Sequence, residues 1–230
     1  MNPSFAALKN QRSGQQLASL FLTTALLLCS LVIAGSLGIT EQMLNVVAEE
    51  YGRRARSRII DWQNIVDEHQ GDSELKKLKA VNDFFNRNRF ISDQQHWKKT
   101  DYWATPIEFL STKGGDCEDF AIAKYVTLRA LDIPDKKLRI TYVKALRLNQ
   151  AHMVLTYYET ARSIPLVLDN LDRKIKPADK RVDLKPVYSF NGDGLWLAKM
   201  RGEGQKLGSA DDLNMWRDLV SRLNRERGSK

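Results

Sequence analysis

Residues 114–119 read Gly-Gly-Asp-Cys-Glu-Asp, so a cysteine stands among three carboxylates at the start of a helical pattern. A cysteine attacks as its thiolate, and neighbouring negative charge raises the pKa of the thiol. A helix N-terminus has the opposite effect, because the helix dipole and its N–H groups stabilise an anion there. The pattern makes Cys117 a candidate nucleophile and requires positive charge to offset Asp116, Glu118 and Asp119.

A nucleophilic cysteine needs a general base, and the chain contains three histidines. His69 lies in the polar run DEHQGD and His96 in QQHWKK, which predicts solvated positions for both. His152 begins an alternating strand pattern, and a strand would hold its ring in a fixed orientation. A strand histidine alone is more often structural, but its pairing with a cysteine at a helix start favours His152 as the base.

A histidine base keeps one tautomer when its second ring nitrogen faces an acceptor, usually a carboxylate or an amide. Asp169 follows the apolar run Leu-Val-Leu, on a predicted strand that we expect beside His152. A carboxylate after three core residues is unusual, because an unpaired buried charge is costly. We expect Asp169 to orient His152. A strand-end turn with Asn170 is the alternative interpretation, and Asp172 is a weaker candidate.

The helices that must position these residues are predicted from apolar spacing and capping residues. They span 40–70 with a bend near Gly52, 73–85, a turn at 105–111, 117–131, and a last segment from Ser209, where Asp212 completes a capping-box pattern. The helix over 117–131 would begin at Cys117 with Asp116 as its N-cap. The cysteine is therefore expected on a first helical turn.

Beyond Pro134 the apolar period changes to that of β-strands. The predicted strands span 138–146, 151–159, 164–171, 186–190 and 195–199. The last two flank the turn Asn-Gly-Asp-Gly at 191–194, whose glycines are better explained by hairpin chemistry than by a calcium loop. Helices followed by strands and a last helix predict an α+β fold, with helices packed on an antiparallel sheet.

The amino terminus has the pattern of an export signal, since an uncharged apolar stretch follows Lys9 and Arg12. Small residues near its end favour cleavage, and its length leaves an uncleaved anchor as the alternative. We predict a signal peptide or signal anchor over 1–39 and a single domain over 40–230. After cleavage Cys117 is the one cysteine left, so no intramolecular disulfide could form in an oxidising compartment.

The formal net charge is +8, and the basic residues are spread among acidic ones rather than gathered in one block. This distribution argues against nucleic acid as a partner. It favours an acidic partner or a membrane surface only weakly.

Three stretches carry a resemblance to a known family: WATPIEFLSTKGGDCEDFAIAKYVTLRALDI, AHMVLTYY and LVLDNL. Their order of helix-borne Cys, strand-borne His and strand-borne Asp resembles the bacterial transglutaminase-like cysteine proteinases, over roughly residues 103–196. The resemblance implies a papain-like, transglutaminase-like core, with Cys117 as nucleophile, His152 as base and acid, and Asp169 as the orienting group.

The same resemblance implies calcium dependence, with Asp116, Glu118 and Asp119 as Ca²⁺ ligands. It further implies a periplasmic endopeptidase that cuts the N-terminal region of a large cell-surface adhesin at an Ala-Ala bond and so promotes biofilm dispersal. An inner-membrane cyclic-di-GMP receptor would sequester it through a periplasmic domain. The residues alone leave alternatives: helix-capping acids without an ion, a transglutaminase or amidase with the same triad, or a non-catalytic calcium-binding module.

Overall fold

The protein is described by a computed structural model that covers residues 37–198 and 204–228, all within the unit formed by residues 34–230. The predicted signal over 1–39 lies outside these residues except for its last three, of which Leu37 is buried in the core. No helix of the described part combines the length and apolarity needed to cross a bilayer.

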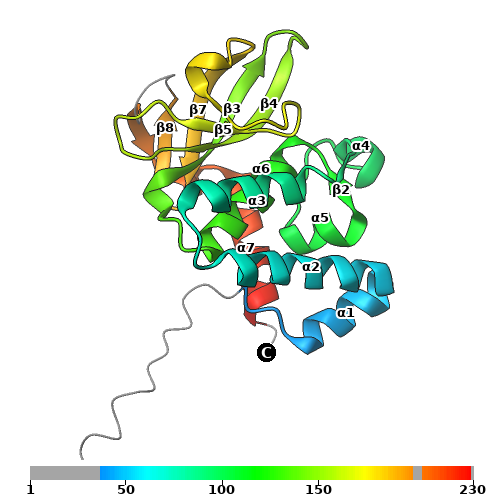
Figure 1. Ribbon diagram of the computed structural model, residues 1–230. Coiled ribbons are helices and arrows are strands. Elements are labelled where there is room, and N and C mark those ends of the chain that lie inside the picture. The colour runs from blue at the N-terminus through cyan, green and yellow to red at the C-terminus, as the bar shows by residue number, and fades with distance from the viewer. Residues whose placement is uncertain (1–36, 199–203, 229–230) are drawn as a thin grey trace, which may run out of the picture. The chain divides into compact units, whose positions relative to one another are not determined.

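Helices make up most of the regular structure up to residue 130, strands make up most of it from residue 138 to 208, and a last helix follows (Figure 1). The helices are α1 (Glu41–Tyr51), α2 (Arg53–His69), α3 (Glu74–Phe85), α4 (Asp93–His96), α5 (Pro106–Thr112), α6 (Cys117–Ala130) and α7 (Asn214–Gly228). The strands are β1 (Arg89–Phe90), β2 (Gly114–Gly115), β3 (Leu138–Ala145), β4 (Gln150–Tyr157), β5 (Leu166–Leu168), β6 (Lys176–Pro177), β7 (Leu184–Asn191), β8 (Gly194–Leu197) and β9 (Gln205–Gly208).

The first predicted helix is two helices, α1 and α2, because the chain breaks at Gly52. Thr40 caps α1, and its Oγ1 accepts a hydrogen bond from the Met43 N–H at 3.2 Å. Gly52 has φ 86°, a conformation that side-chain-bearing residues rarely adopt, so the helical ladder cannot continue through it. The predicted bend is therefore a complete break.

The main sheet has seven strands in the order β6-β5-β4-β3-β7-β8-β9, and all its pairings are antiparallel. This confirms the predicted strands over 138–146 and 151–159 and the hairpin turn between β7 and β8. The strand predicted over 164–171 is shorter, spanning Leu166–Leu168, and the chain leaves the sheet just before Asp169. Strands β6 and β9 and the small parallel pair β1–β2 were not predicted.

Helix α6 is the centre of the core. It is buried continuously from Asp119 to Leu128, because it packs against β3 and β4 of the sheet and also against α3 and α5. A helix that is covered on all sides has no solvated stripe, which is why its sequence is apolar around most of its circumference. This packing fixes the first turn of α6, and Cys117 with it.

The last helix begins later than predicted. Ser209 does cap a turn, but its Oγ accepts from the Asp211 N–H at 3.1 Å and the turn is a short 3₁₀ segment, Ala210–Asp212. Helix α7 begins at Asn214, beyond that segment, so the predicted capping box does not start it. The fold class is confirmed as α+β, with helices packed on an antiparallel sheet.

Candidate active site

The two glycines before Cys117 allow two close approaches of the backbone. A Cβ at Gly114 would lie 2.3 Å from the Arg89 carbonyl oxygen, in the parallel β1–β2 pair. A Cβ at Gly115 would lie 2.1 Å from Oδ2 of Asp119, whose carboxylate accepts a hydrogen bond from the Asp116 N–H at 3.2 Å. The glycines therefore let the chain enter α6 against other backbone and against this carboxylate.

Cys117 and His152 line the same cleft, which lies between the start of α6 and the start of β4. Cys117 is half-buried, and its sulfur faces the Met153 N–H of β4. His152 is buried, and its Nε2 lies 2.8 Å from Oδ1 of Asp169. The structure thus brings together the three residues predicted to form a triad, from three separate elements.

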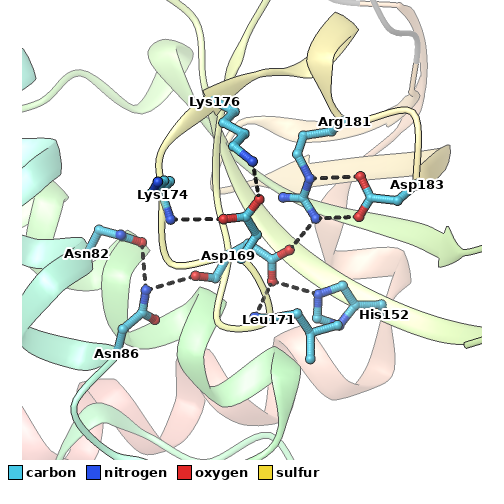
Figure 2. A network of polar contacts seen from close by, with 10 residues as sticks. Asn82, Asn86, His152, Asp169, Leu171, Lys174, Lys176, Arg181 and Asp183 are labelled. Atoms are coloured by element: carbon cyan, nitrogen blue, oxygen red, sulfur yellow. Dashed lines mark hydrogen bonds and ion pairs between the residues drawn. The ribbon is translucent and has the colours of Figure 1, made fainter. Parts of the chain in front are cut away.

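Asp169 is fixed by donors on both oxygens, as Figure 2 shows. Its Oδ1 accepts from the Leu171 N–H at 3.0 Å as well as from His152, and its Oδ2 accepts from Arg181 Nη2 at 2.7 Å. Burial alone would raise its pKa, but the hydrogen bonds and the nearby His152 outweigh burial and lower the pKa to about 2. Asp169 is therefore an ionised acceptor.

The tautomer of His152 follows from that ionisation. An ionised carboxylate can only accept, so Nε2 of His152 must carry the proton that bonds to Asp169. In the neutral ring this leaves a lone pair on Nδ1. His152 can therefore serve as a base through Nδ1 while Asp169 holds the other nitrogen.

Arg181 completes the support of Asp169 and was not predicted. Its side chain is 3% exposed and also binds Asp183, with Nε 3.0 Å from Oδ1 and Nη2 2.9 Å from Oδ2. Asn86 of the loop after α3 adds a hydrogen bond from Nδ2 to the Asp169 carbonyl oxygen, at 2.8 Å. Neither residue stands in a recognisable motif, and only the fold brings them to Asp169.

Five carboxylates gather beside Cys117, and we call them the acid cluster: Asp93, Asp101, Asp116, Glu118 and Asp119. Oxygens of Asp93, Asp116 and Asp119 lie within 4.8 Å of one another, and so do oxygens of Asp93, Asp101 and Glu118. Of the three predicted Ca²⁺ ligands, Asp116 and Asp119 share one of these groups and Glu118 lies in the other, with Asp93 common to both. Asp93 and Asp101 were missed, because they lie in a polar loop region of the sequence whose path had no periodicity to predict.

The acid cluster has few internal partners. Asp119 accepts from the Ala104 N–H at 2.7 Å, and Asp93 accepts from the Tyr102 N–H, but one buried oxygen of Asp93 and one of Asp116 accept no hydrogen bond. Among the described residues no lysine or arginine forms an ion pair with the cluster. Buried carboxylate oxygens without donors fit a hard divalent cation such as Ca²⁺.

The pKa values of the acid cluster also show that its negative charges have too few donors and positive groups around them. Burial, then the charge of neighbouring carboxylates, raises the pKa of Asp116 to about 10. Burial raises the pKa of Asp93 to about 6 and raises those of Asp101 and Asp119 as well. These groups could all ionise at neutral pH only with added positive charge.

The thiol of Cys117 responds to the same charges. Burial raises its pKa, and Glu118 raises it further, since the thiol donates to Oε2 of Glu118 at 3.0 Å. The Met153 N–H lowers the pKa, but by less. The protein's own groups therefore keep Cys117 protonated, and positive charge on the acid cluster would favour the thiolate.

The other two histidines lie outside this cleft and are less solvated than predicted. His69 is half-buried at the end of α2, with Nδ1 2.7 Å from Oδ2 of Asp72. His96 ends α4, and its Nε2 lies 2.8 Å from Oγ1 of Thr112. Each has a structural partner, so His152 alone among the three histidines shares a cleft with Cys117.

Comparisons with known proteins agree with this arrangement. The family profile of the bacterial transglutaminase-like cysteine proteinase, BTLCP, matches residues 53–183. The structure of LapG from Legionella pneumophila is similar at 44% identity and a TM-score of 0.70, covering 82% of this chain and 97% of that one. A search of curated proteins gives no significant match.

Two further structures of the same relative are also similar, one treated with the chelator EGTA and one bound to calcium. An EGTA-treated LapG from Legionella pneumophila is similar at 44% identity and a TM-score of 0.71, over 82% of this chain and 97% of that one. A calcium-bound LapG is similar at 46% identity and a TM-score of 0.69, over 80% of this chain and 99% of that one. Calcium binding is thus a recorded property of that relative.

Proposed function

Since the chain belongs to the bacterial transglutaminase-like cysteine proteinase family, and is therefore a cysteine protease, we propose that Cys117, His152 and Asp169 form its catalytic triad. The observation that carries this proposal is the hydrogen bond from His152 Nε2 to Asp169, since His152 also lines the cleft that contains Cys117. It leaves Nδ1 as the basic nitrogen and gives the imidazolium a fixed counter-charge.

In the proposed reaction His152 Nδ1 takes the proton of the Cys117 thiol, and the sulfur attacks a peptide carbonyl carbon. The N–H groups of the first turn of α6 stabilise the oxyanion that forms. His152 then gives its proton to the leaving amine, which leaves a thioester on Cys117. Next, His152 removes a proton from water, which attacks the thioester and releases the acid product with the thiol restored.

We further propose that the acid cluster holds Ca²⁺. The oxygens of Asp93, Asp101, Asp116, Glu118 and Asp119 would be its ligands, and the two buried oxygens without hydrogen bonds support this assignment. A bound cation would supply positive charge next to the Cys117 thiol. The chain's own part is to hold the carboxylates together and to keep the first turn of α6 in place.

The substrate, partner and location are proposed from the family resemblance. We propose that the protein acts in the periplasm on the N-terminal region of a large cell-surface adhesin, and that its cleavage releases the adhesin and promotes biofilm dispersal. An inner-membrane cyclic-di-GMP receptor is proposed as the inhibitory partner, through its periplasmic domain. The relation to LapG at 44% identity supports these assignments.

The test incubates the full domain with N-terminal fragments of large adhesins, with calcium and with EGTA, and identifies products by mass spectrometry. Cleavage that needs calcium and is absent in Cys117→Ala is the expected result. Transfer of an added amine to the fragment, in place of hydrolysis, would instead identify a transglutaminase. Equal cleavage by the wild type and Cys117→Ala would refute the triad.

A further inference from the structure

A second hollow lies next to the active-site cleft, between the turn that joins β3 to β4 and the segment 171–184. We call it the basic groove. Its most exposed walls are formed by Arg147, Leu148, Leu171, Arg173, Lys180 and Val182, and the partly exposed Asp172, Lys176 and Asp183 also line it. The main chain holds the two sides together, since the Leu146 N–H donates to the Asp183 carbonyl oxygen at 2.8 Å. The groove therefore belongs to the folded surface.

The charge of the basic groove is only partly neutralised within the protein. Lys176 is paired with Asp172 at 2.7 Å, and Arg181 is occupied by Asp169 and Asp183. Arg147, Arg173 and Lys180 are exposed, and in the described part of the chain no carboxylate forms an ion pair with them. Three cationic side chains are thus available to a ligand.

Apolar side chains lie between these cations. Leu148, Leu171 and Val182 are 53%, 51% and 74% exposed, which is high for side chains of this kind clustered on one surface. A ligand that fits both features carries carboxylates and apolar groups in alternation, which describes an acidic peptide segment. A single-stranded nucleic acid fits poorly, because the groove lining contains no aromatic ring on which a base could stack.

Leu171 connects the basic groove to the catalytic machinery. It lines the groove and also the cleft that contains Cys117 and His152, and its N–H donates to Asp169 Oδ1 at 3.0 Å. A peptide that lies across the cleft and continues past Leu171 enters the groove. The groove is therefore placed to bind the same polypeptide chain that the cysteine cuts.

We propose that the basic groove is a substrate subsite, which binds an acidic segment with apolar residues on one side of the scissile bond. This proposal rests on the proposed protease function and adds the chemical class of the sequence that it selects. Arg147, Arg173 and Lys180 are its specificity-determining residues, and Leu148, Leu171 and Val182 bind the apolar side chains. A second copy of the chain docked groove to groove is not the occupant, because two grooves of the same sign repel each other.

The test digests a proteome-derived peptide library with the full domain in calcium and sequences the products by mass spectrometry. The variant Arg147→Glu/Arg173→Glu/Lys180→Glu reverses the charge of the three exposed cations of the groove. The matched control Lys136→Glu/Arg162→Glu/Lys185→Glu reverses three exposed charges outside it. Cys117→Ala supplies the background.

We expect Asp and Glu to be enriched on one side of the bonds cut by the wild type and the control. In the groove variant this enrichment should disappear, and kcat/KM for an acidic peptide found in the library should fall about ten-fold, chiefly through KM. Cleavage by the wild type without acidic enrichment, or with the same enrichment in the groove variant, overturns the subsite. Absence of any cleavage above the Cys117→Ala background overturns the protease function itself, and the subsite with it.

Discussion

Asp169, which contacts His152, and the acid cluster, which lies beside Cys117, are two ways of burying carboxylates. Asp169 has donors on both oxygens and a guanidinium beside it, and its pKa falls to about 2. In the acid cluster two buried oxygens have no donor, and the pKa values of Asp93 and Asp116 rise to about 6 and about 10. The two regions bury the same chemical group and leave it in opposite electrostatic states.

The two regions differ in the source of the positive charge and hydrogen-bond donors that would compensate their carboxylates. The support of Asp169 is built from the protein's own residues, so the orientation of His152 does not depend on solution conditions near neutral pH. The acid cluster lacks such support, so its full ionisation would require the proposed cation. In the proposed site, the orientation of the base is therefore permanent, and the charge state of the nucleophile is conditional on that cation.

The largest effect is expected from breaking the triad itself. Cys117→Ala and His152→Ala should each lower kcat/KM by at least about 10³-fold, because the nucleophile or its base is lost. His69→Ala is the matched control, and its effect should stay within a few-fold, since His69 contacts Asp72 outside the cleft. Kinetics on a cleaved adhesin fragment measure all three, and an essential His69 would contradict the choice of base.

Removal of calcium should have the next largest effect, and it should act on the acid cluster and Cys117 but not on the Asp169–His152 pair. EGTA should abolish cleavage reversibly, and Mg²⁺ should restore it poorly because it requires a smaller, stricter octahedron. Asp93→Asn and Glu118→Gln should each weaken calcium binding about ten-fold or more in calorimetry, whereas exposed Asp61→Asn should not. No heat of binding with the wild type would show that the cluster is not a calcium site.

Removal of Arg181 should weaken the support of Asp169, which the protein provides with its own residues. Arg181→Met leaves Asp169 with two donors, and we expect a loss of about 2–4 kcal/mol in the free energy of unfolding at pH 7. Arg181→Lys should recover part of this loss. Calcium affinity should remain unchanged in both variants, because Arg181 pairs with Asp169 and Asp183 and not with the acid cluster. A large fall in calcium affinity would mean that the two regions are not independent.

The same variant should change the response to acid. The pKa of Asp169 lies below its ordinary value of 3.8, so its stabilisation is complete above about pH 4 and is lost as the pH falls toward 2. Arg181→Met raises that pKa, so acid unfolding should begin at a higher pH than in the wild type. Circular dichroism against pH measures the shift, and coincident curves would contradict the role of Arg181.

The smallest effect concerns Lys124, a buried lysine of α6 whose Nζ has no hydrogen-bond partner among the described residues. Burial lowers its pKa from 10.5 to about 7, although the charge of Asp169 opposes that shift. The unfolded chain therefore binds a proton that the folded chain lacks between about pH 7 and 10.5, so stability rises with pH there. In Lys124→Met the denaturant midpoint should rise less over that range, and an equal rise in both proteins would contradict this assignment.

The three residues of the proposed triad could be selected from the sequence, whereas their supports could not. Cys117 follows a Gly-Gly turn and an N-cap aspartate, His152 begins an alternating strand pattern, and Asp169 directly follows an apolar run, so their types and positions were informative. Arg181, Asn86, Asp93 and Asp101 lie in loops or at helix ends, where no pattern fixes the path of the chain. Long-range packing brings them to the site, and one sequence does not encode that packing in any local signal.

The helices and the central strands were predicted for the same reason, and the errors lie at their boundaries. Gly52 breaks a helix that periodicity alone extended, because its positive φ depends on the path of the chain. The capping pattern at Ser209 proved to begin a 3₁₀ turn, since Ser and Asp stabilise both kinds of start. Strands of two to four residues, such as β6 and β9, are too short to show a period.

The small β1–β2 pair joins the two segments of chain that lead to the proposed calcium site. Backbone bonds from the Arg89 N–H to the Lys113 carbonyl and from the Ile91 N–H to the Gly115 carbonyl tie the chain that leads to Asp93 to the chain that leads to Cys117. These bonds hold the carboxylates close together, and burial with the neighbouring charges raises the pKa of Asp116, so the cluster retains protons. On the proposed assignment, calcium would bind where two segments of the chain are already joined by backbone bonds, so binding would require little ordering of the chain.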